Sequence, residues 1–143
     1  RPIFDKFIIP SLNKSILSPS KLWKEWIIKS INQNIYKTEL KQFKNIYSGL
    51  IATGDKFLSD RKDIDKLKEA LPKVKAVEME GGAFAQVAEQ ENIPWVILRV
   101  ISDSADESAA EDFSEFISIY SASSWNLIKY ILKNFENCPK FHE

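Results

Sequence analysis

One run of apolar residues constrains the fold of this chain more than any other feature. Residues 95–101 read WVILRVI, and only Arg99 interrupts their apolar character. A strand with one solvated face alternates between polar and apolar residues, whereas a nearly continuous apolar run is typical of a strand buried on both faces. Such strands occur mainly in parallel sheets that helices cover on both sides. The run therefore predicts a layered α/β fold.

Further strand and helix patterns alternate around this run. Strands are predicted at residues 43–53 and 74–80, helices at residues 19–32, 60–70 and 82–90, and a long helical stripe at residues 112–135, while residues 3–9 are either a strand or irregular. This order predicts a three-layer α/β/α domain with a mixed, largely parallel central sheet. In detail, we expect the first helix to begin after Ser18, and Phe84, Val87 and Ala88 to share the apolar side of the helix at 82–90.

Composition excludes several classes of function. The 20 basic and 20 acidic residues cancel and form no basic cluster, which argues against nucleic-acid binding. No apolar run is long enough to span a membrane. The single cysteine, Cys138, excludes an internal disulfide and fits a reducing compartment, so we expect a cytoplasmic protein. One cysteine and one histidine, His142, both near the C-terminus, cannot build a metal site, and we expect neither a metal nor a cofactor.

Polar residues gather at the predicted carboxyl ends of three strands, where ligands of α/β proteins bind. They are the segment TGDKF at 53–57, the acids Glu78 and Glu80, and Arg99 with the segment SD at 102–103. If the strand continues to residue 80, Glu78 and Glu80 point to the same face. Carboxylates there could bind the hydroxyls of a sugar diol, or could be ordinary helix-start charges favoured by the helix dipole. The residue types alone leave these alternatives balanced.

Two further charged residues have alternative explanations. A guanidinium within a buried strand needs an acid or an anionic ligand, so Arg99 is expected to pair with Glu78 or Glu80. Asp103 lies between two serines, and it could cap a helix or, if partial burial raises its pKa, donate a proton.

The motifs VEMEGGAFAQVA, IPWVILRVISDSAD and SGLIATGDKF resemble the C-terminal half of the purine nucleoside phosphorylase/nucleosidase superfamily. Within it, they are most similar to the bacterial 5′-methylthioadenosine/S-adenosylhomocysteine nucleosidases. The resemblance implies that Phe57 stacks on the adenine ring and that the Leu58 backbone binds the edge of that ring. It also implies that Ser102 supports Asp103, and that Asp103 protonates or hydrogen-bonds the purine N7 as the catalytic acid.

On the sugar side, the resemblance implies a second set of contacts. Met79 would pack against the ribose while Glu80 binds its hydroxyls, and Phe113 would line the pocket for the 5′-thio substituent. Glu78 and Arg99 would order the polar floor around sugar and water.

The activity implied is hydrolysis of the N-ribosidic bond of 5′-methylthioadenosine or S-adenosylhomocysteine, which releases adenine. A phosphorylase, another purine-riboside hydrolase such as a futalosine-type enzyme, and a non-catalytic nucleoside-binding module remain alternatives. The family's water-activating glutamate and early glycine-rich loop have no counterpart here. We therefore expect residues 1–143 to be the C-terminal portion of one nucleosidase/phosphorylase-like domain that lacks its N-terminal portion. A purine nucleoside and a second copy, in a homodimer, are the expected partners.

Overall fold

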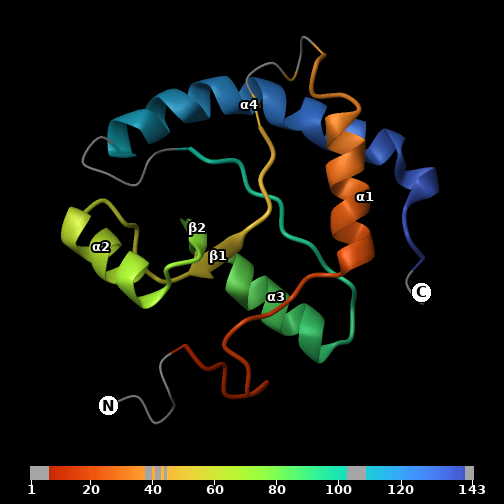
Figure 1. The fold of residues 1–143 in the computed structure, drawn as a ribbon. Coiled ribbons are helices and arrows are strands. Elements are labelled where there is room, and N and C mark those ends of the chain that lie inside the picture. Colours follow the sequence, from red (N-terminus) through yellow and green to blue (C-terminus); the bar gives the residue numbers. More distant parts are fainter. Residues whose placement is uncertain (1–6, 38–39, 41–42, 44, 103–108, 141–143) are drawn as a thin grey trace.

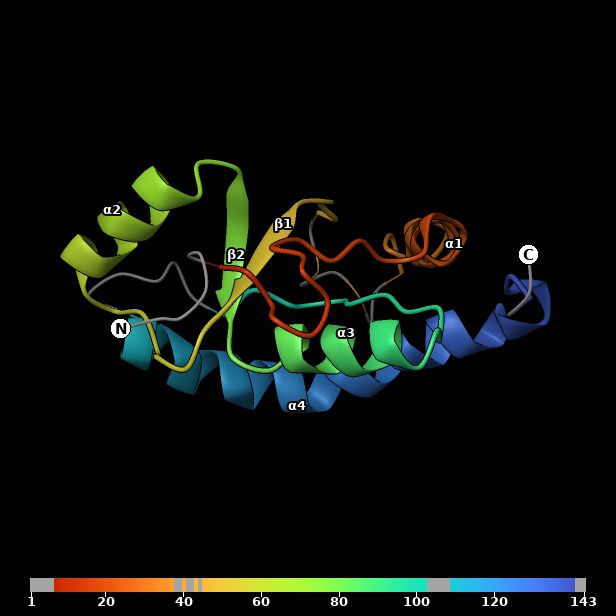
Figure 2. The same cartoon turned by 90° about the horizontal axis from the view of Figure 1, so that it is seen from below.

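The computed structural model describes residues 7–37, 40, 43, 45–102 and 109–140 (Figure 1). The elements, in chain order, are α1 (Lys21–Asn32), β1 (Leu50–Thr53), α2 (Arg61–Ala70), β2 (Val74–Glu78), α3 (Gly81–Gln90), α4 (Ala109–Lys133) and the 3-10 helix η2 (Phe135–Asn137). Helices and parallel strands alternate, which confirms the α/β class. The 25-residue helix α4 extends along one side of the molecule (Figure 2). None of the described helices is long and apolar enough to cross a lipid bilayer.

Capping side chains determine where the first two helices begin. The Ser20 hydroxyl accepts a hydrogen bond from Trp23 N at 3.4 Å, so α1 begins two residues later than the predicted start after Ser18. The Ser20 amide also donates to Trp95 O at 3.0 Å, which anchors this helix start to the segment after α3. Asp60 caps α2 by accepting from Lys62 N at 2.7 Å, as expected for an aspartate immediately before a charged helix.

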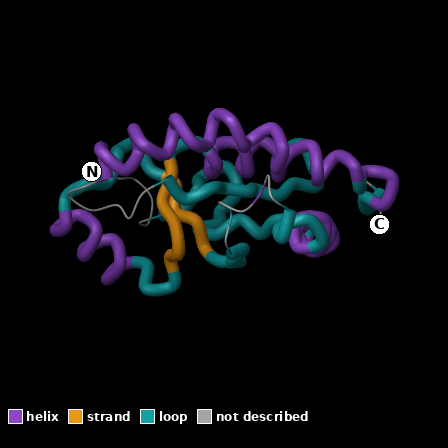
Figure 3. Tube along the Cα trace, turned by 90° about the horizontal axis from the view of Figure 1, so that it is seen from above, coloured by secondary structure: helices purple, strands orange, loops and turns teal. Residues whose placement is uncertain are grey.

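The described strands form one parallel pair, drawn in orange in Figure 3. Leu50 pairs with Val74 and, after a register shift, Thr53 pairs with Glu78. The amide of Gly54 donates to Glu78 O at 3.0 Å and continues the ladder just beyond β1. The register therefore places Thr53 beside Glu78 at the carboxyl ends of both strands, where the sequence predicted the ligand site.

Two predicted strands are shorter than expected. Of the strand predicted at 43–53, only β1 forms. The strand predicted at 74–80 ends at Glu78, because the next residues turn into α3 and Glu80 is its N-cap. Of residues 3–9, the described ones contribute a single antiparallel bridge between Ile9 and Lys14.

The prediction of a buried strand at residues 95–101 is wrong for the described structure. This segment, the teal trace that follows α3 in Figure 1, is not paired as a strand. Trp95 is 8% exposed, but Leu98 is 40% and Ile101 63% exposed. Among the described residues, residues 96–101 make no backbone–backbone hydrogen bond. An apolar run forms a strand only where neighbouring strands satisfy its N–H and C=O groups, and the described chain supplies no such neighbours.

Among the residues that the structure describes, the apolar core is divided into two clusters. The larger one joins α1 to α4 and consists of Ile31, Leu40, Leu127 and Tyr130. The smaller one packs α3 against the segment after it through Ala85, Ala88 and Trp95. Because α3 turns its alanine face toward Trp95, Phe84 and Val87 point outward and are 57% and 59% exposed. The predicted apolar side of this helix is therefore correct only for Ala88.

The aromatic residues of α1 pack within the molecule. The rings of Trp23 and Trp26 meet edge to face with their centroids 5.6 Å apart. Trp26 also donates its indole N–H to Asn134 O at 3.3 Å and meets Phe135 edge to face. These contacts join α1 to the end of α4, so both tryptophans have a structural role.

Candidate functional site

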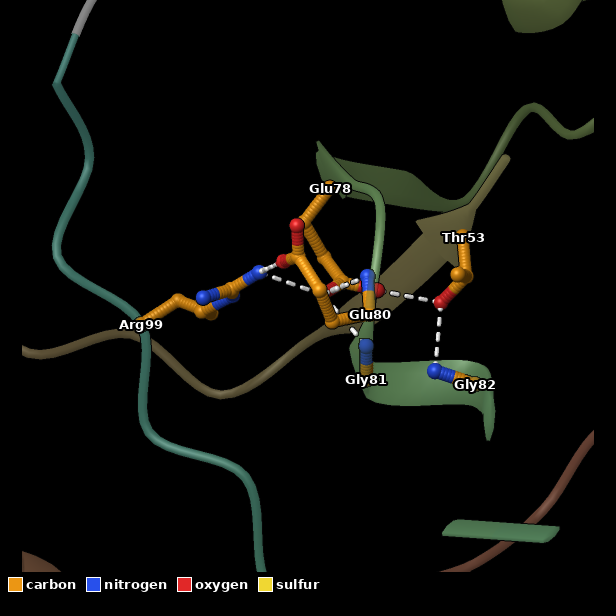
Figure 4. A network of polar contacts seen from close by, with 6 residues as sticks. All are labelled: Thr53, Glu78, Glu80, Gly81, Gly82 and Arg99. Atoms are coloured by element: carbon orange, nitrogen blue, oxygen red, sulfur yellow. Dashed lines mark hydrogen bonds and ion pairs between the residues drawn. The ribbon is translucent and has the colours of Figure 1, made fainter. Parts of the chain in front are cut away.

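A polar network connects the ends of β1 and β2, the start of α3 and the extended segment at residues 95–101 (Figure 4). The Glu78 carboxylate is its centre. One oxygen, Oε2, accepts from the backbone amides of Glu80 at 3.1 Å and Gly81 at 2.6 Å. The other, Oε1, accepts from the Thr53 hydroxyl. A single side chain thus ties together two strands and a helix.

Arg99 connects the extended segment to this network. Its Nη2 donates to Glu78 Oε2 at 2.5 Å and also to Glu80 Oε2. The prediction that Arg99 pairs with one of these acids is confirmed, and it pairs with both. Its side chain is 37% exposed, so the guanidinium lies at the mouth of the site and not within a buried strand as predicted.

The two acids differ in what they can offer a ligand. The Glu78 side chain is only 6% exposed, and its bonds to the first amides of α3 make it a helix-start charge. Glu80 is the N-cap residue of α3 but makes no side-chain cap bond, and its side chain is 74% exposed. Of the alternatives left open by the sequence, helix stabilisation applies to Glu78, whereas the Glu80 carboxylate can accept ligand hydroxyls.

The network controls the charge of its members. Burial tends to raise the pKa of Glu78, but the hydrogen bonds from Thr53, the amides of Gly81 and Glu80, and Arg99 outweigh it and lower that pKa from its ordinary value of 4.5. Burial likewise tends to lower the pKa of Arg99, but its bonds to Glu80 and Glu78 raise it. Glu78 and Arg99 are therefore both ionised at neutral pH.

Replacing Glu78 with glutamine is expected to lower the free energy of unfolding at neutral pH. Because the folded-state pKa of Glu78 lies below 4.5, the unfolded chain takes up this proton first as the pH falls. The stabilisation is complete above pH 4.5 and is lost as the pH falls through the folded-state pKa. Urea unfolding of both proteins, from neutral pH to about pH 3, is expected to show the difference shrinking in acid. A constant difference would contradict an ionised, hydrogen-bonded Glu78.

Two neighbouring hollows open beside the network. The larger has a volume of about 1480 Å³, and its lining includes Thr53, Glu78, Met79 and Arg99. The smaller, of about 270 Å³, is lined by Glu80, Gly81, Phe84, Arg99 and residues 96–98. Arg99 lines both hollows, whereas Met79 lines only the larger and Glu80 only the smaller.

Two residues with predicted contacts to the base lie apart from this network. Phe57 and Leu58 belong to the loop between β1 and α2, and neither lines either hollow. Phe57 is 47% exposed and Leu58 is half-buried. The Lys56–Asp63 ion pair holds this loop against the first turn of α2. The structure thus brings together Glu78, Glu80 and Arg99 of the predicted sugar-side residues, but it does not bring the predicted aromatic ring to them.

The remaining predicted site residues follow the extended segment. Ser102 is half-buried at its end, and Asp103 lies outside the described residues. Phe113 is in α4, and its side chain is also outside the description. Within the described part of the chain, no three His, Cys, Asp or Glu side chains are grouped as metal ligands.

Thr53 is a member of the network to which the sequence analysis gave no role. Its hydroxyl donates to Glu78 and accepts from the Gly82 amide at 2.7 Å. The sequence does show a hydroxyl residue at the end of one predicted strand and two glycines at the start of a predicted helix. These residues can be connected to each other only when the register that pairs Thr53 with Glu78 is known.

Proteins of known function resemble this chain over most of its length. The 5′-methylthioadenosine/S-adenosylhomocysteine nucleosidase of Buchnera aphidicola subsp. Acyrthosiphon pisum (strain Tuc7) is 40% identical over 110 residues, which are 77% of this chain and 46% of that protein. The crystal structure of the nucleosidase of that name from Neisseria meningitidis, in complex with methylthio-immucillin-A, has a TM-score of 0.71 and 30% identity and covers 88% of this chain and 51% of that one. The futalosine hydrolase of Helicobacter pylori strain 26695 has a TM-score of 0.67 and 27% identity, with coverage of 82% and 47%.

The chain spans about half the length of these relatives. The sequence pattern of the phosphorylase superfamily matches residues 20–133, which include every described helix and strand except η2. The structural matches have the fold expected from the sequence motifs. This chain belongs to the phosphorylase superfamily.

Proposed function

We propose that this protein takes part in hydrolysis of the N-ribosidic bond of adenine nucleosides such as 5′-methylthioadenosine and S-adenosylhomocysteine. The observation that carries the proposal is the pairing of Arg99 with Glu78 and Glu80 at the carboxyl ends of two parallel strands, beside an open hollow. Relatives at 40% and 30% identity that bear the nucleosidase name support this substrate class.

The proposed chemistry follows from the charges that develop when this bond breaks. The sugar becomes positive and the leaving base negative in the transition state. The exposed carboxylate of Glu80 would accept hydrogen bonds from the ribose hydroxyls, and Arg99 would hold it in position. Carboxylates near the sugar also stabilise its positive charge. Met79, which lines the larger hollow, would pack against the ribose.

The base is proposed to bind on the side of Phe57 and Asp103. Asp103 would donate a proton or a hydrogen bond to the purine N7 and make adenine a better leaving group. Phe57, which is 47% exposed, would stack on the adenine, and the Leu58 backbone would bind its edge. Ser102 would support Asp103, and Phe113 would contact the 5′ substituent.

We also propose that the complete site includes polypeptide that corresponds to the unmatched half of the relatives. Three observations support this: the relatives are about twice as long, the apolar side chains of Leu98 and Ile101 are exposed, and residues 96–101 make no backbone–backbone hydrogen bonds within the described chain. Residues 1–143 would then be the C-terminal portion of a single domain. A homodimer is proposed because uncovered strand edges favour a partner, and the cytoplasm because the one cysteine is unpaired.

The direct test is to incubate the intact protein with 5′-methylthioadenosine in phosphate-free buffer and to follow adenine release. Release without phosphate is the expected result. Turnover only after phosphate is added would assign a phosphorylase instead. Turnover of futalosine without turnover of 5′-methylthioadenosine would assign a futalosine-type hydrolase. Adenine binding in calorimetry without turnover of any purine nucleoside would identify a non-catalytic binding module.

Replacing Glu80 with glutamine is expected to raise KM for 5′-methylthioadenosine about tenfold or more, because hydrogen bonds from hydroxyls to a charged group contribute about 1.5–3 kcal/mol. The matched control is Glu91→Gln at the other end of α3, which is exposed and is expected to leave KM unchanged. Steady-state rates of adenine release measure both variants. Unchanged KM and kcat in Glu80→Gln would rule out the proposed contact with the ribose.

A further inference from the structure

Thr53 occupies the junction between β1, β2 and α3. Its hydroxyl donates to Glu78 Oε1 and accepts from the Gly82 amide at 2.7 Å (Figure 4). One oxygen therefore satisfies a helix N-terminal amide and at the same time orients a buried carboxylate. Although Thr53 as a residue is exposed, both partners of its hydroxyl belong to the site.

The close approach of Thr53 to α3 depends on the glycine at position 82. A Cβ atom added at Gly82 would lie 2.8 Å from Thr53 Oγ1 and 2.9 Å from Thr53 Cβ, closer than side chains pack. The strand register holds Thr53 at this point by pairing it with Glu78. The backbone on both sides thus fixes the position of the hydroxyl.

The orientation of the Glu78 carboxylate depends on the hydroxyl of Thr53. Among the described residues, Thr53 is the donor to Oε1, while three donors share Oε2, including Arg99. Without the hydroxyl, Oε1 would lose its donor and the Gly82 amide its acceptor. The Glu78 carboxylate could then rotate. Because Arg99 bonds to this carboxylate and to Glu80, the rotation would also displace the Arg99–Glu80 pair.

We propose that Thr53 is a positioning residue that fixes the Glu78 carboxylate and, through it, the Arg99–Glu80 pair that faces the sugar. Thr53 itself touches no substrate in this scheme. The effect of Thr53 on the hydrogen bonds of Glu78 and Gly82 can be tested without substrate. Its effect on turnover rests on the proposed nucleosidase function.

The structural test compares Thr53→Val, which keeps the shape and removes the hydroxyl, with Thr53→Ser, which keeps the hydroxyl. We expect hydrogen exchange of the Gly82 amide to become about tenfold faster or more in Thr53→Val and to stay close to the wild-type rate in Thr53→Ser. The carboxyl carbon of Glu78, followed by NMR during an acid titration, is expected to titrate at higher pH in Thr53→Val only. Equal Gly82 exchange and equal Glu78 titration in all three proteins would overturn the proposal. Fast exchange of the Gly82 amide in Thr53→Ser would also overturn it, because serine keeps the hydroxyl.

The kinetic test uses adenine release from 5′-methylthioadenosine by the intact protein. Thr53→Val is expected to raise KM about tenfold, because the pair that faces the sugar loses its orientation, and Thr53→Ser is expected to restore it. A wild-type KM in Thr53→Val would overturn the effect on the sugar side. If the wild-type protein releases no adenine, the proposed function fails, and the exchange and titration results still decide the role of Thr53.

Discussion

Replacing Asp103 with asparagine is expected to lower kcat for adenine release about 100-fold or more, while the melting temperature changes little. Asparagine cannot transfer a proton to the purine N7, so adenine would have to leave unprotonated and would be a poorer leaving group. In the sequence Asp103 follows Arg99 by four residues, so the two Cα atoms lie no more than about 14 Å apart in any conformation of the chain. Steady-state adenine release and thermal unfolding of both proteins measure the two quantities.

A substrate that needs no acid provides the sharpest control for this variant. A nitrophenyl riboside has a leaving group that departs without protonation, so Asp103→Asn is expected to hydrolyse it at nearly the wild-type rate. An equal loss on both substrates would indicate that Asp103 has another role, such as holding the sugar or the fold. Full activity of Asp103→Asn on 5′-methylthioadenosine would show that the catalytic acid is a different group.

Replacing Gly81 with alanine is expected to lower the free energy of unfolding by about 1 kcal/mol and to reduce kcat/KM for adenine release by up to about tenfold, because the atoms that must move are the end of the Glu78 side chain and its hydrogen bonds. The added Cβ would lie 2.9 Å from Glu78 Oε1 and 3.0 Å from Oε2, so the carboxylate would have to move. The movement would break the bond from the Gly81 amide and disturb the contact with Arg99. Urea unfolding and steady-state kinetics measure the two losses.

Gly54→Ala is the matched control for this variant. Gly54 directly follows β1, whereas Gly81 is the first residue of α3, three residues after β2 ends. A Cβ at Gly54 would meet no atom within 4 Å, and its backbone has no positive φ. We expect this variant to keep both the stability and the activity of the wild type. If Gly54→Ala and Gly81→Ala were equally impaired, loss of glycine flexibility would be the cause, and displacement of Glu78 would not.

The sequence predicted those parts of the site that follow from local chemistry. A charged Arg99 in an apolar run requires an acid, and two acids stood at the end of a neighbouring predicted strand, so its pairing could be inferred from the cost of an unpaired charge. The helix predicted at 60–70 differs from α2 only at its first residue, because Asp60 is the N-cap that precedes the helix. The role of Thr53 could not be predicted, because it depends on a strand register set by residues far apart in the chain.

The errors have a common physical origin in long-range packing. Residues 95–101 carry the pattern of a central strand, but a strand also requires neighbours, and its own residues do not reveal whether these are present. The outward position of Phe84 depends similarly on which face of α3 meets Trp95. The cap of α1 is Ser20 and not Ser18, and the Ser20 amide also bonds the carbonyl oxygen of Trp95, a residue far away in the sequence.

The extended segment also has a consequence for handling the protein. A stretch such as VILRVI combines strong β-propensity with a single charge, and in the described chain its amides and carbonyls lack backbone partners. Identical copies could stack these groups in register, as in cross-β fibrils. Concentrated solutions of residues 1–143 are therefore expected to form aggregates that bind thioflavin. Any polypeptide that covers the segment would prevent this aggregation.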